Sequence, residues 1–304
     1  MLLMPRPIPR RHCPMELIWL EDFEALAEYG SFVRAADARH ITQPAFSRRI
    51  RSLENWIGAD LFTRTPQGAT LTEAGKHILA SAQDAASRLY RIRAEAQEVA
   101  GTAAKTLQFA ATHSLSFTFF PRWIRSAEKG APIESVRLHS DSMATCEQML
   151  VHGQVQFLLC HRHPDVPPRL TAEQFVSKEI GHDILLALAG RSGQFNASPE
   201  SLPYLAYTEE SGLGRIVSHR LQGKGEFLTL KPRFSSHLAA VLMSMALENK
   251  GVAWLPKSLT EQEISDARLH RVLDPRWDIP LEIHLTRPVA PLSPYAEAFW
   301  ARLQ

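Results

Sequence analysis

Residues 30–58 read GSFVRAADARHITQPAFSRRIRSLENWIG, and this stretch decides the fold of the N-terminal part of the chain. The pattern predicts two short helices joined by a tight corner. Ser31 stands at the N-cap position of the first helix, where its hydroxyl can accept a hydrogen bond from a backbone N–H. Thr42 takes the same place in the second helix, and Pro44 lies in its first turn, where a missing N–H costs little. Small and apolar residues form an inward face that lets the helices cross closely: Ala35, Ala36, Ala45, Ile50 and Leu53.

The outward face of the second predicted helix is polar and basic. From Arg39 to Ser52 the chain has four arginines and no acidic residue. Glutamine, serine and arginine side chains at the start of a helix suit contacts with base edges and phosphates in a major groove. The alternative is the solvated face of a small helical domain. The caps, the corner and the basic face coincide in one stretch, which favours DNA binding. The face carries Gln43, Pro44, Ser47, Arg48 and Arg51, with Arg49 at its edge.

A helix and a hairpin flank this pair. Apolar residues recur at helical spacing over 16–29, which predicts a first helix packed beneath the other two. Residues 61–64 and 69–71 flank the sequence TPQG, which predicts a short hairpin. Arg64 lies on this hairpin and is expected to contact the DNA backbone, because most protein–DNA hydrogen bonds go to phosphate and sugar.

Four motifs in this region occur together: SFxxAA from Ser31, QPAxS from Gln43, LExxxGxxLFxR from Leu53 and LTxAG from Leu71. In combination they resemble the winged helix-turn-helix of the LysR-type bacterial transcriptional regulators. The resemblance implies a DNA-binding domain over residues 15–72 and double-stranded DNA as partner. We expect the major groove to be read by Gln43, Ser47 and Arg48, with Pro44 and Arg51 beside them, and phosphates to be held by Ser31, Arg34, Arg49 and Arg64.

Composition sets the limits for the rest of the chain. The 304 residues suffice for two or three packed domains, and a net charge of +2 confines any basic footprint to a local surface. Three cysteines make no disulfide framework and fit a reducing cytoplasm. No apolar run reaches membrane-spanning length. Residues 1–14 are interrupted by Pro5, Pro7 and Pro9 and lack the apolar core of a signal peptide, so a disordered lead-in is expected there.

A long helix is predicted to follow the hairpin. From Ala74 to Val99, small and apolar residues recur at steps of three and four, which indicates a narrow seam suited to a helix–helix dimer contact. The alternative is a helix packed on its own domain. The resemblance favours the dimer, and implies a homotetramer through the C-terminal domains. Residues 73–102 are therefore assigned to a linker and dimerisation helix with a hinge at Gly101-Thr102.

From Lys105 onward, apolar strands alternate with helices, which predicts an α/β region with a mainly parallel sheet. The whole chain is thus expected to be an α+β multi-domain protein. By resemblance, residues 103–304 form a two-lobed effector-binding domain like those of periplasmic binding proteins. Its first lobe is expected at about 103–180 and 288–304, and its second at about 181–287.

Ligands of open α/β sheets lie beyond the carboxyl ends of strands, where helix N-termini offer N–H groups. Segments 113–116, 208–212 and 235–237 meet this description, and the serine-rich pair among them suits a small anion or carboxylate. The alternative is that the serines are plain helix caps. The expected ligand-binding set is His113, Ser114, Ser116, His161, Tyr207, Ser211, Ser235, Ser236 and His237.

The sequence Cys160-His161-Arg162-His163 invites a metal interpretation. A closed zinc site needs four ligands, and no matching cysteine or histidine pair stands at suitable spacing, so no metal site is expected. A redox role for Cys160 is a further alternative, with a buried apolar cysteine as the default.

Further matches, including AAxHSLS from Ala110 and GxAWLP from Gly251, resemble the hypochlorite-responsive subgroup of LysR-type regulators. Activation in that subgroup is attributed to methionine oxidation. The corresponding positions here are Ala127, Leu213 and His237, so that mechanism does not carry over. The methionines Met143, Met149, Met243 and Met245 stand elsewhere, where core packing is expected.

We therefore expect a cytoplasmic, DNA-binding LysR-type regulator with a small-molecule effector of unknown identity and no cofactor. RNA polymerase is a further partner that the resemblance implies. The alternative is a redox-sensing regulator of the same type, acting through Cys160 or methionine oxidation. An enzyme is not expected, because the chain has no Gly-x-Ser-x-Gly elbow and no phosphate-binding glycine-rich loop.

Overall fold

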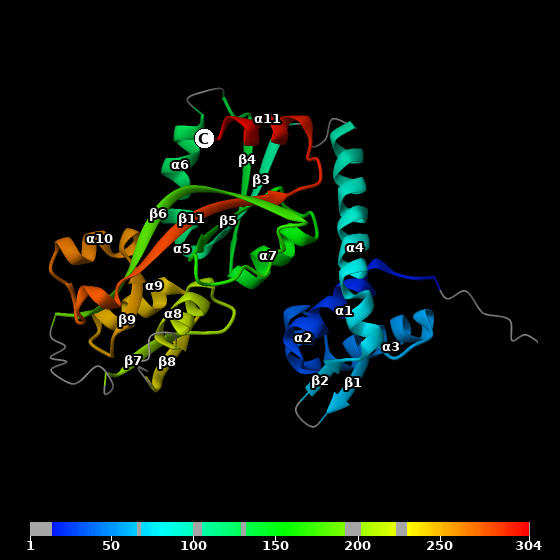
Figure 1. Ribbon diagram of the computed structural model, residues 1–304, viewed down its shortest axis with the longest axis horizontal. Coiled ribbons are helices and arrows are strands. Elements are labelled where there is room, and N and C mark those ends of the chain that lie inside the picture. Colours follow the sequence, from blue (N-terminus) through cyan, green and yellow to red (C-terminus); the bar gives the residue numbers. More distant parts are fainter. Residues whose placement is uncertain are drawn as a thin grey trace, which may run out of the picture. The chain divides into compact units, whose positions relative to one another are not determined.

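A computed structural model describes residues 14–65, 68–99, 105–128, 132–191, 202–222 and 230–303. The expected lead-in at 1–14 and the hinge at Gly101-Thr102 lie, apart from residue 14, outside these ranges. The chain divides into two compact units, residues 1–93 and 94–304, which are described separately (Figure 1). Among the described residues, no helix has the length and apolar composition that a membrane span requires.

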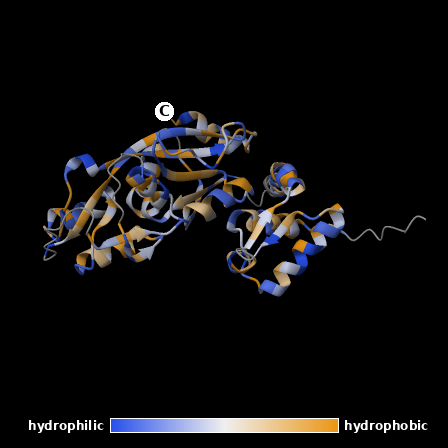
Figure 2. Cartoon of the chain, turned by 60° about the horizontal axis from the view of Figure 1, so that its bottom comes forward, coloured by the Kyte–Doolittle hydropathy of each residue, from blue (hydrophilic) through white to orange (hydrophobic). Residues whose placement is uncertain are grey.

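The first unit is the expected winged helix-turn-helix. Its elements are α1 (Leu17–Tyr29), α2 (Phe32–Ala38), α3 (Gln43–Ile57), β1 (Phe62–Thr65), β2 (Gly68–Leu71) and α4 (Glu73–Val99). Hydrophobic and hydrophilic residues alternate along its helices (Figure 2), and the hydrophobic ones meet in a core that includes Phe23, Phe46 and Leu53. The predicted helices and hairpin are confirmed.

The caps of α2 and α3 differ in detail from the expectation. Ser31 and Thr42 occupy the N-cap positions, but neither hydroxyl accepts a cap hydrogen bond. Their backbone carbonyls instead begin the helices, by accepting from the N–H groups of Ala35 at 2.9 Å and Phe46 at 3.0 Å. In α3, Pro44 has removed one of the N–H groups that a cap would satisfy.

Glu54 and Gly75 join the hairpin to the helices. The Glu54 carboxylate accepts hydrogen bonds from the backbone N–H groups of Leu61 at 2.9 Å and Phe62 at 3.2 Å. A Cβ atom at Gly75 would lie 2.3 Å from the carbonyl oxygen of Leu61, so α4 can begin against β1 only with glycine there. The Leu-Glu and Ala-Gly motifs therefore position the wing.

The seam predicted on α4 divides between two environments. Ala74 and Ile78 pack against the core of the first unit. Further along, Leu89 and Ile92 are exposed, as are Ser81, Ala85 and Ala96. The first part of the seam therefore anchors the helix to its own domain, and the second part leaves an exposed apolar stripe.

The second unit is built on a seven-stranded mixed sheet. The strands β3 (Thr106–Thr112), β4 (Ser135–Asp141) and β5 (Phe157–Arg162) are parallel. The rest of the sheet is antiparallel, contrary to the mainly parallel sheet expected, and comprises β6 (Phe175–Gly190), β9 (Ala253–Pro256), β10 (Leu269–Arg271) and β11 (Ile279–Pro288). A separate parallel pair consists of β7 (Tyr204–Tyr207) and β8 (Pro232–Ser236).

Two long strands cross the whole unit. β6 and β11 run side by side, with β3, β4, α6 (Phe120–Ala127) and α11 (Pro294–Arg302) at one end (Figure 1). At the other end lie β7–β9, α8 (Gly212–Gln222), α9 (Ala239–Leu247) and α10 (Lys257–Ser265). The predicted lobe boundaries near residues 181 and 288 fall inside these strands. The first half of β6 escaped prediction because Ser177, Lys178 and Glu179 interrupt the apolar residues of 175–181, which leaves no continuous apolar run.

Two short helices follow β3, namely α5 (His113–Thr118) and α6, and they are separated at Phe119. Pro121 lies in the first turn of α6, where it cannot donate to a preceding carbonyl. The break matters because it makes α5 a short helix whose first residues face the site described below. The remaining elements are α7 (Met143–Val151) and a short 3-10 helix at Pro275–Trp277.

We predict that Gly75→Ala loosens the wing. The added methyl group must displace the backbone of Leu61, and overpacking of this kind costs on the order of 1–3 kcal/mol. Hydrogen exchange should become faster at residues 61–72, including the Thr72 N–H that donates to the Leu61 carbonyl. Ser81→Ala, at an exposed position of the same helix, should leave that exchange unchanged; equal protection in Gly75→Ala would contradict the prediction.

Candidate functional site

Some of the predicted DNA-binding residues of α3 are exposed, and others are buried or paired within the domain. Gln43, Pro44, Arg48 and Arg51 are exposed. Ser47 is buried, which corrects its assignment to the outward face, and the Gln43 side-chain amide lies 3.1 Å from its hydroxyl. Ser47 therefore positions Gln43.

Arg49 also differs from the expectation of a DNA-facing edge. It forms an ion pair with Asp22 of α1 at 3.4 Å, and Asp22 is fully buried. Arg39 binds the same carboxylate at 2.9 Å and also pairs with Glu21. Burial raises the pKa of Asp22 although both arginines act to lower it. Two of the four arginines in the basic stretch are thus engaged within the domain.

The other predicted phosphate-binding residues lie around the helix-turn-helix and the wing. Ser31 is half-buried at the start of α2. Arg34 is exposed, and its guanidinium donates to the Tyr29 carbonyl at 2.5 Å. Arg64 on β1 is exposed and stacks over the ring of Phe32, 4.4 Å from the ring centroid. Contacts within the first unit thus hold the side chains of Arg34 and Arg64 in position.

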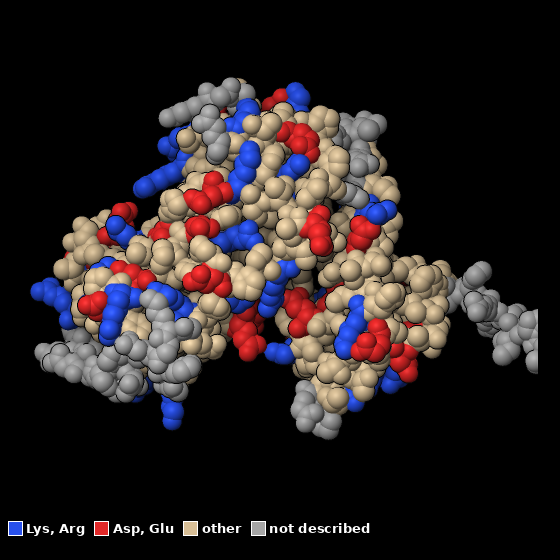
Figure 3. Space-filling view, viewed as in Figure 1, with Lys and Arg blue, Asp and Glu red and all other residues tan. Residues whose placement is uncertain are grey.

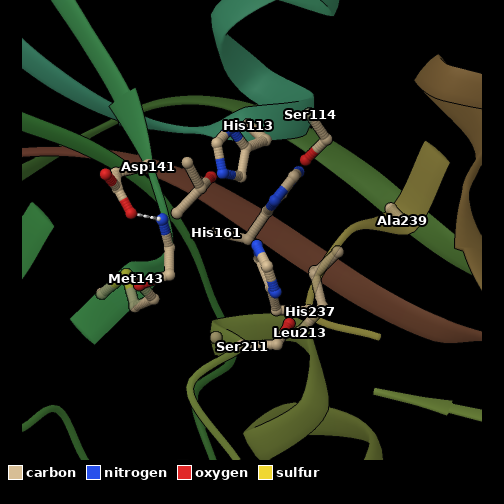
Figure 4. A pocket seen from close by; sticks show the side chains of 12 residues that line it. His113, Ser114, Asp141, Met143, His161, Ser211, Leu213, His237 and Ala239 are labelled. Atoms are coloured by element: carbon tan, nitrogen blue, oxygen red, sulfur yellow. Dashed lines mark hydrogen bonds between the residues drawn. The ribbon is translucent and has the colours of Figure 1, made fainter. Parts of the chain in front are cut away.

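In the second unit, a cavity opens at the carboxyl ends of β3, β4 and β5 (Figure 4). Three helices of nine or more residues, α7, α8 and α9, begin at its wall with Met143, Gly212 and Ala239. Helix N-termini carry partial positive charge and unsatisfied N–H groups, which favour an anion. The space is about 400 Å³ and partly open to solvent. The cavity therefore suits a small, negatively charged ligand.

Three histidines converge on this cavity from three different segments (Figure 4). His113 begins α5, His161 lies on β5, and His237 follows β8. The rings of His113 and His237 are 5.8 Å apart, and His113 Nδ1 lies 3.0 Å from the Ser140 hydroxyl. Burial lowers the pKa of His113, and the neighbouring His237 adds to this effect against the opposing charge of Asp141.

His161 is the least satisfied polar group at the cavity. Its side chain is 2% exposed, and neither ring nitrogen has a hydrogen-bond partner among the described residues. The nearest charge is the Asp183 carboxylate, 3.5 Å from Nε2. Asp183 itself is held by the hydroxyl of Ser258 at 2.5 Å and by the N–H of Ile184 at 2.8 Å. Leaving a buried polar group unpaired costs about 1–3 kcal/mol, so a ligand that bonds to this ring would recover that energy.

The cavity includes five of the nine predicted ligand-binding residues: His113, Ser114, His161, Ser211 and His237. Ser116 lies outside its lining and bonds to the His113 carbonyl at 2.7 Å. Tyr207 donates to the Trp254 carbonyl at 2.9 Å and packs among core residues. Ser235 is exposed away from the cavity, and the Ser236 hydroxyl accepts from the N–H of Leu238 at 3.1 Å. His237, directly after β8, lines the cavity instead.

Sequence reasoning missed the segment 141–143. The Asp141 carboxylate accepts from the N–H of Ser142 at 2.7 Å, and the Ser142 hydroxyl caps α7 by accepting from Thr145 at 3.2 Å (Figure 4). A signal was present, because serine is a favourable N-cap residue and Ser142 directly follows β4. Met143 belongs to a core cluster, as expected, but it also lines the cavity.

The charged surface gives little guidance about the ligand. On the face of the second unit shown in Figure 3, lysines and arginines are interspersed with aspartates and glutamates. Any preference for an anionic over a cationic ligand therefore depends on the groups inside the cavity, namely the helix N-termini and the histidines.

Cys160 has a poor environment for redox chemistry. Burial raises the pKa of its thiol to about 12, and that of Cys146 likewise to about 12. The thiolate is the reactive form of cysteine, so both side chains are structural at neutral pH. The sulfur of Cys160 packs in the core between β5 and α7.

Comparison with known proteins agrees with this architecture. Residues 17–76 match the model of the bacterial regulatory helix-turn-helix protein, lysR family, and residues 100–304 match the LysR substrate binding domain. The HTH-type transcriptional regulator YjiE of Escherichia coli is 29% identical over 95% of this chain and 94% of its own length.

Solved structures show the same arrangement. DarR of Vibrio fischeri, solved in complex with DNA, is 28% identical, with a TM-score of 0.54 over 95% of this chain and 98% of that one. Full-length HypT of Salmonella typhimurium, a hypochlorite-specific LysR-type regulator, is 28% identical, with a TM-score of 0.53 over 95% of this chain and 97% of that one. The chain belongs to the LysR-type family of DNA-binding transcriptional regulators, with an N-terminal helix-turn-helix and a C-terminal effector-binding domain.

Proposed function

We propose that this regulator is controlled by a small anion or carboxylate that binds in the cavity between α5, α7, α8 and α9. The buried ring of His161 at the cavity wall carries this proposal, because its Nδ1 has no hydrogen-bond partner among the described residues. The N-termini of three helices supply the positive potential that an anion needs, and two further histidines add ring nitrogens that can donate hydrogen bonds. The regulatory domain of HypT, 25% identical over 66% of this chain with a TM-score of 0.53, has been solved with a bromide ion bound, which supports an anionic ligand.

On the DNA side, Gln43 and Arg48 are proposed to reach base edges in the major groove, with Pro44 and Arg51 beside them on the exposed face of α3. Ser31, Arg34 and Arg64 are proposed to hold phosphates. Arg49 and Ser47 act from behind this face, through Asp22 and Gln43 respectively. A protein with this role works in the cytoplasm, where the chromosome lies.

Ligand binding is proposed to alter the angle between two lobes joined by β6 and β11. His161 stands on β5 and faces Asp183 on β6, so a ligand on His161 acts directly at a crossing strand. The exposed stripe of α4 around Leu89 and Ile92 is the proposed dimer contact. LysR regulators act as oligomers, and a change of lobe angle would alter the spacing of two reading heads in a homotetramer and their approach to RNA polymerase.

We predict that Arg48→Ala weakens operator binding and flattens its salt dependence. Loss of one cationic side chain from the groove should reduce the slope of log affinity against log salt by up to about 0.9, the value for one neutralised phosphate. Fluorescence anisotropy with operator DNA at several salt concentrations measures both quantities. Arg49→Ala is the matched control, because its ion pair with Asp22 predicts lower stability with a smaller change in slope. An unchanged slope in Arg48→Ala would remove this residue from the interface.

We predict that His161→Phe abolishes anion binding while the empty protein still folds. The substitution keeps a ring of similar shape and removes an unpartnered Nδ1, but it also takes Nε2 away from the buried Asp183 carboxylate, so the free protein should melt at a somewhat lower temperature. Thermal shift with bromide, chloride, acetate and benzoate should show stabilisation of the unsubstituted protein and of the control, but not of His161→Phe. His219→Gln, at an exposed histidine of α8, is the control. Undiminished anion stabilisation in His161→Phe would contradict the proposal.

Anion affinity should rise as the pH falls from 8 to 6. Because burial lowers the pKa of His113, its ring is neutral in the empty cavity at pH 7. A bound anion favours the charged ring and raises its pKa, so the complex binds more protons than the free protein. Calorimetry in two buffers of different ionisation enthalpy should reveal proton uptake of up to one proton from this group. An affinity that is independent of pH over this range would exclude His113 from direct contact.

A further inference from the structure

A cluster of two glutamates and two histidines lies on the crossing strands, apart from the ligand cavity. Glu179 and His182 belong to β6, and Glu282 and His284 belong to β11. The proposed ligand and DNA roles use none of these residues.

A β-bulge brings the four side chains to one face. Glu282 and His284 are two residues apart, so they share a face of β11. Glu179 and His182 are three residues apart and would point to opposite faces of a regular strand. The register pairs Glu282 with His182, Ile283 with Gly181 and His284 with Glu179, which leaves Ile180 as the extra residue. Bulges re-aim side chains in this way, and they are common at functional sites.

The distances suit a metal ion. One ligand atom each from Glu179, Glu282 and His284 lie within 4.8 Å of one another. His284 Nε2 lies 2.8 Å from the Glu282 carboxylate, and His182 Nε2 lies 3.0 Å from the Glu179 carboxylate. Ligands about 2.1 Å from a common tetrahedral ion are roughly 3.4 Å apart, so small side-chain rotations would complete the site.

Burial and charge also permit a cation. His284 is 14% exposed and His182 is 73% exposed, so the cluster is half-buried on one side and open to solvent on the other. Arg162 pairs with Glu282 in the strand register, and its guanidinium donates to the Ser177 hydroxyl at 3.0 Å. The negative charge of Glu282 also acts on the ring of His163. Two carboxylates against one guanidinium leave the site negative.

We propose that Glu179, Glu282 and His284, with His182 as a fourth ligand, bind a divalent transition-metal ion of the zinc class. Imidazole and carboxylate ligands together suit such ions better than calcium or magnesium. The ion would tie β6 to β11 where both strands cross the unit, and would thereby restrict bending between its two ends. That consequence rests on the proposed lobe movement, whereas the binding of the ion does not.

Titration of the full-length, chelator-treated protein with zinc chloride in a calorimeter tests the proposal. We expect one ion per chain at this site. His284→Ala and Glu282→Gln should each weaken binding by at least about 100-fold, the upper end of what loss of an outer-shell partner costs. His219→Ala and His270→Ala change exposed histidines elsewhere and should bind zinc normally. Glu179→Gln, at an exposed position, keeps the test open if the more buried variants fail to fold.

Cobalt(II) gives a second readout. The expected complex shows d–d absorption without a thiolate charge-transfer band, because its ligands are nitrogen and oxygen. A thiolate band, undiminished binding in the folded variants, or no zinc binding would each overturn the proposal, and would leave the four residues as two ion pairs, one within each strand. Titration of the same samples with bromide reports on the ligand cavity separately, so failure of one proposal is distinguishable from failure of the other.

Discussion

The antiparallel pairing of β6 with β11 is the constraint on which the second unit depends. These strands pair with each other over ten positions. β11 also pairs with β5, and β6 also pairs with β9 and β10. Backbone hydrogen bonds of a sheet interior cannot be given up singly without burying unpaired groups. Any relative movement of the two ends must therefore occur as twist or bend along this ribbon, and the bulge at Ile180 is the point where its regular pairing is already interrupted.

The ligand cavity is a consequence of that arrangement. Strands from one end and helices from the other meet at the same place, so α7 and α8 both begin at the cavity although they belong to opposite ends of the sheet. An ion pair next to the cavity connects the two helices: Arg215 of α8 lies 3.1 Å from the Glu147 carboxylate of α7. An anion between these helix N-termini would contact both ends at once. The binding of an anion would in this way be coupled to any relative movement of the two ends of the sheet.

In the first unit, a buried acidic group determines which arginines remain available for DNA. Asp22 and Glu21 lie under α2 and α3, and they require cationic partners because an isolated buried carboxylate is costly. Arg39 and Arg49 fill that need. The exposed basic face is consequently narrower than the number of arginines in the sequence indicates, and it centres on Arg48 and Arg51.

The sequence by itself determined the helix-turn-helix, the wing, the long helix, the family and most strands of the second unit, because each depends on local periodicity and turn chemistry. It also placed His113, Ser114, Ser211 and His237 at strand ends, where ligand sites form. It could not show that Ser47 is buried, that Arg49 pairs with Asp22, or that Tyr207 turns to Trp254, because these depend on neighbours distant in the chain. Only the tertiary structure decided that a one-residue bulge brings Glu179 and His182 onto the face of Glu282 and His284, since register between strands about a hundred residues apart leaves no local pattern.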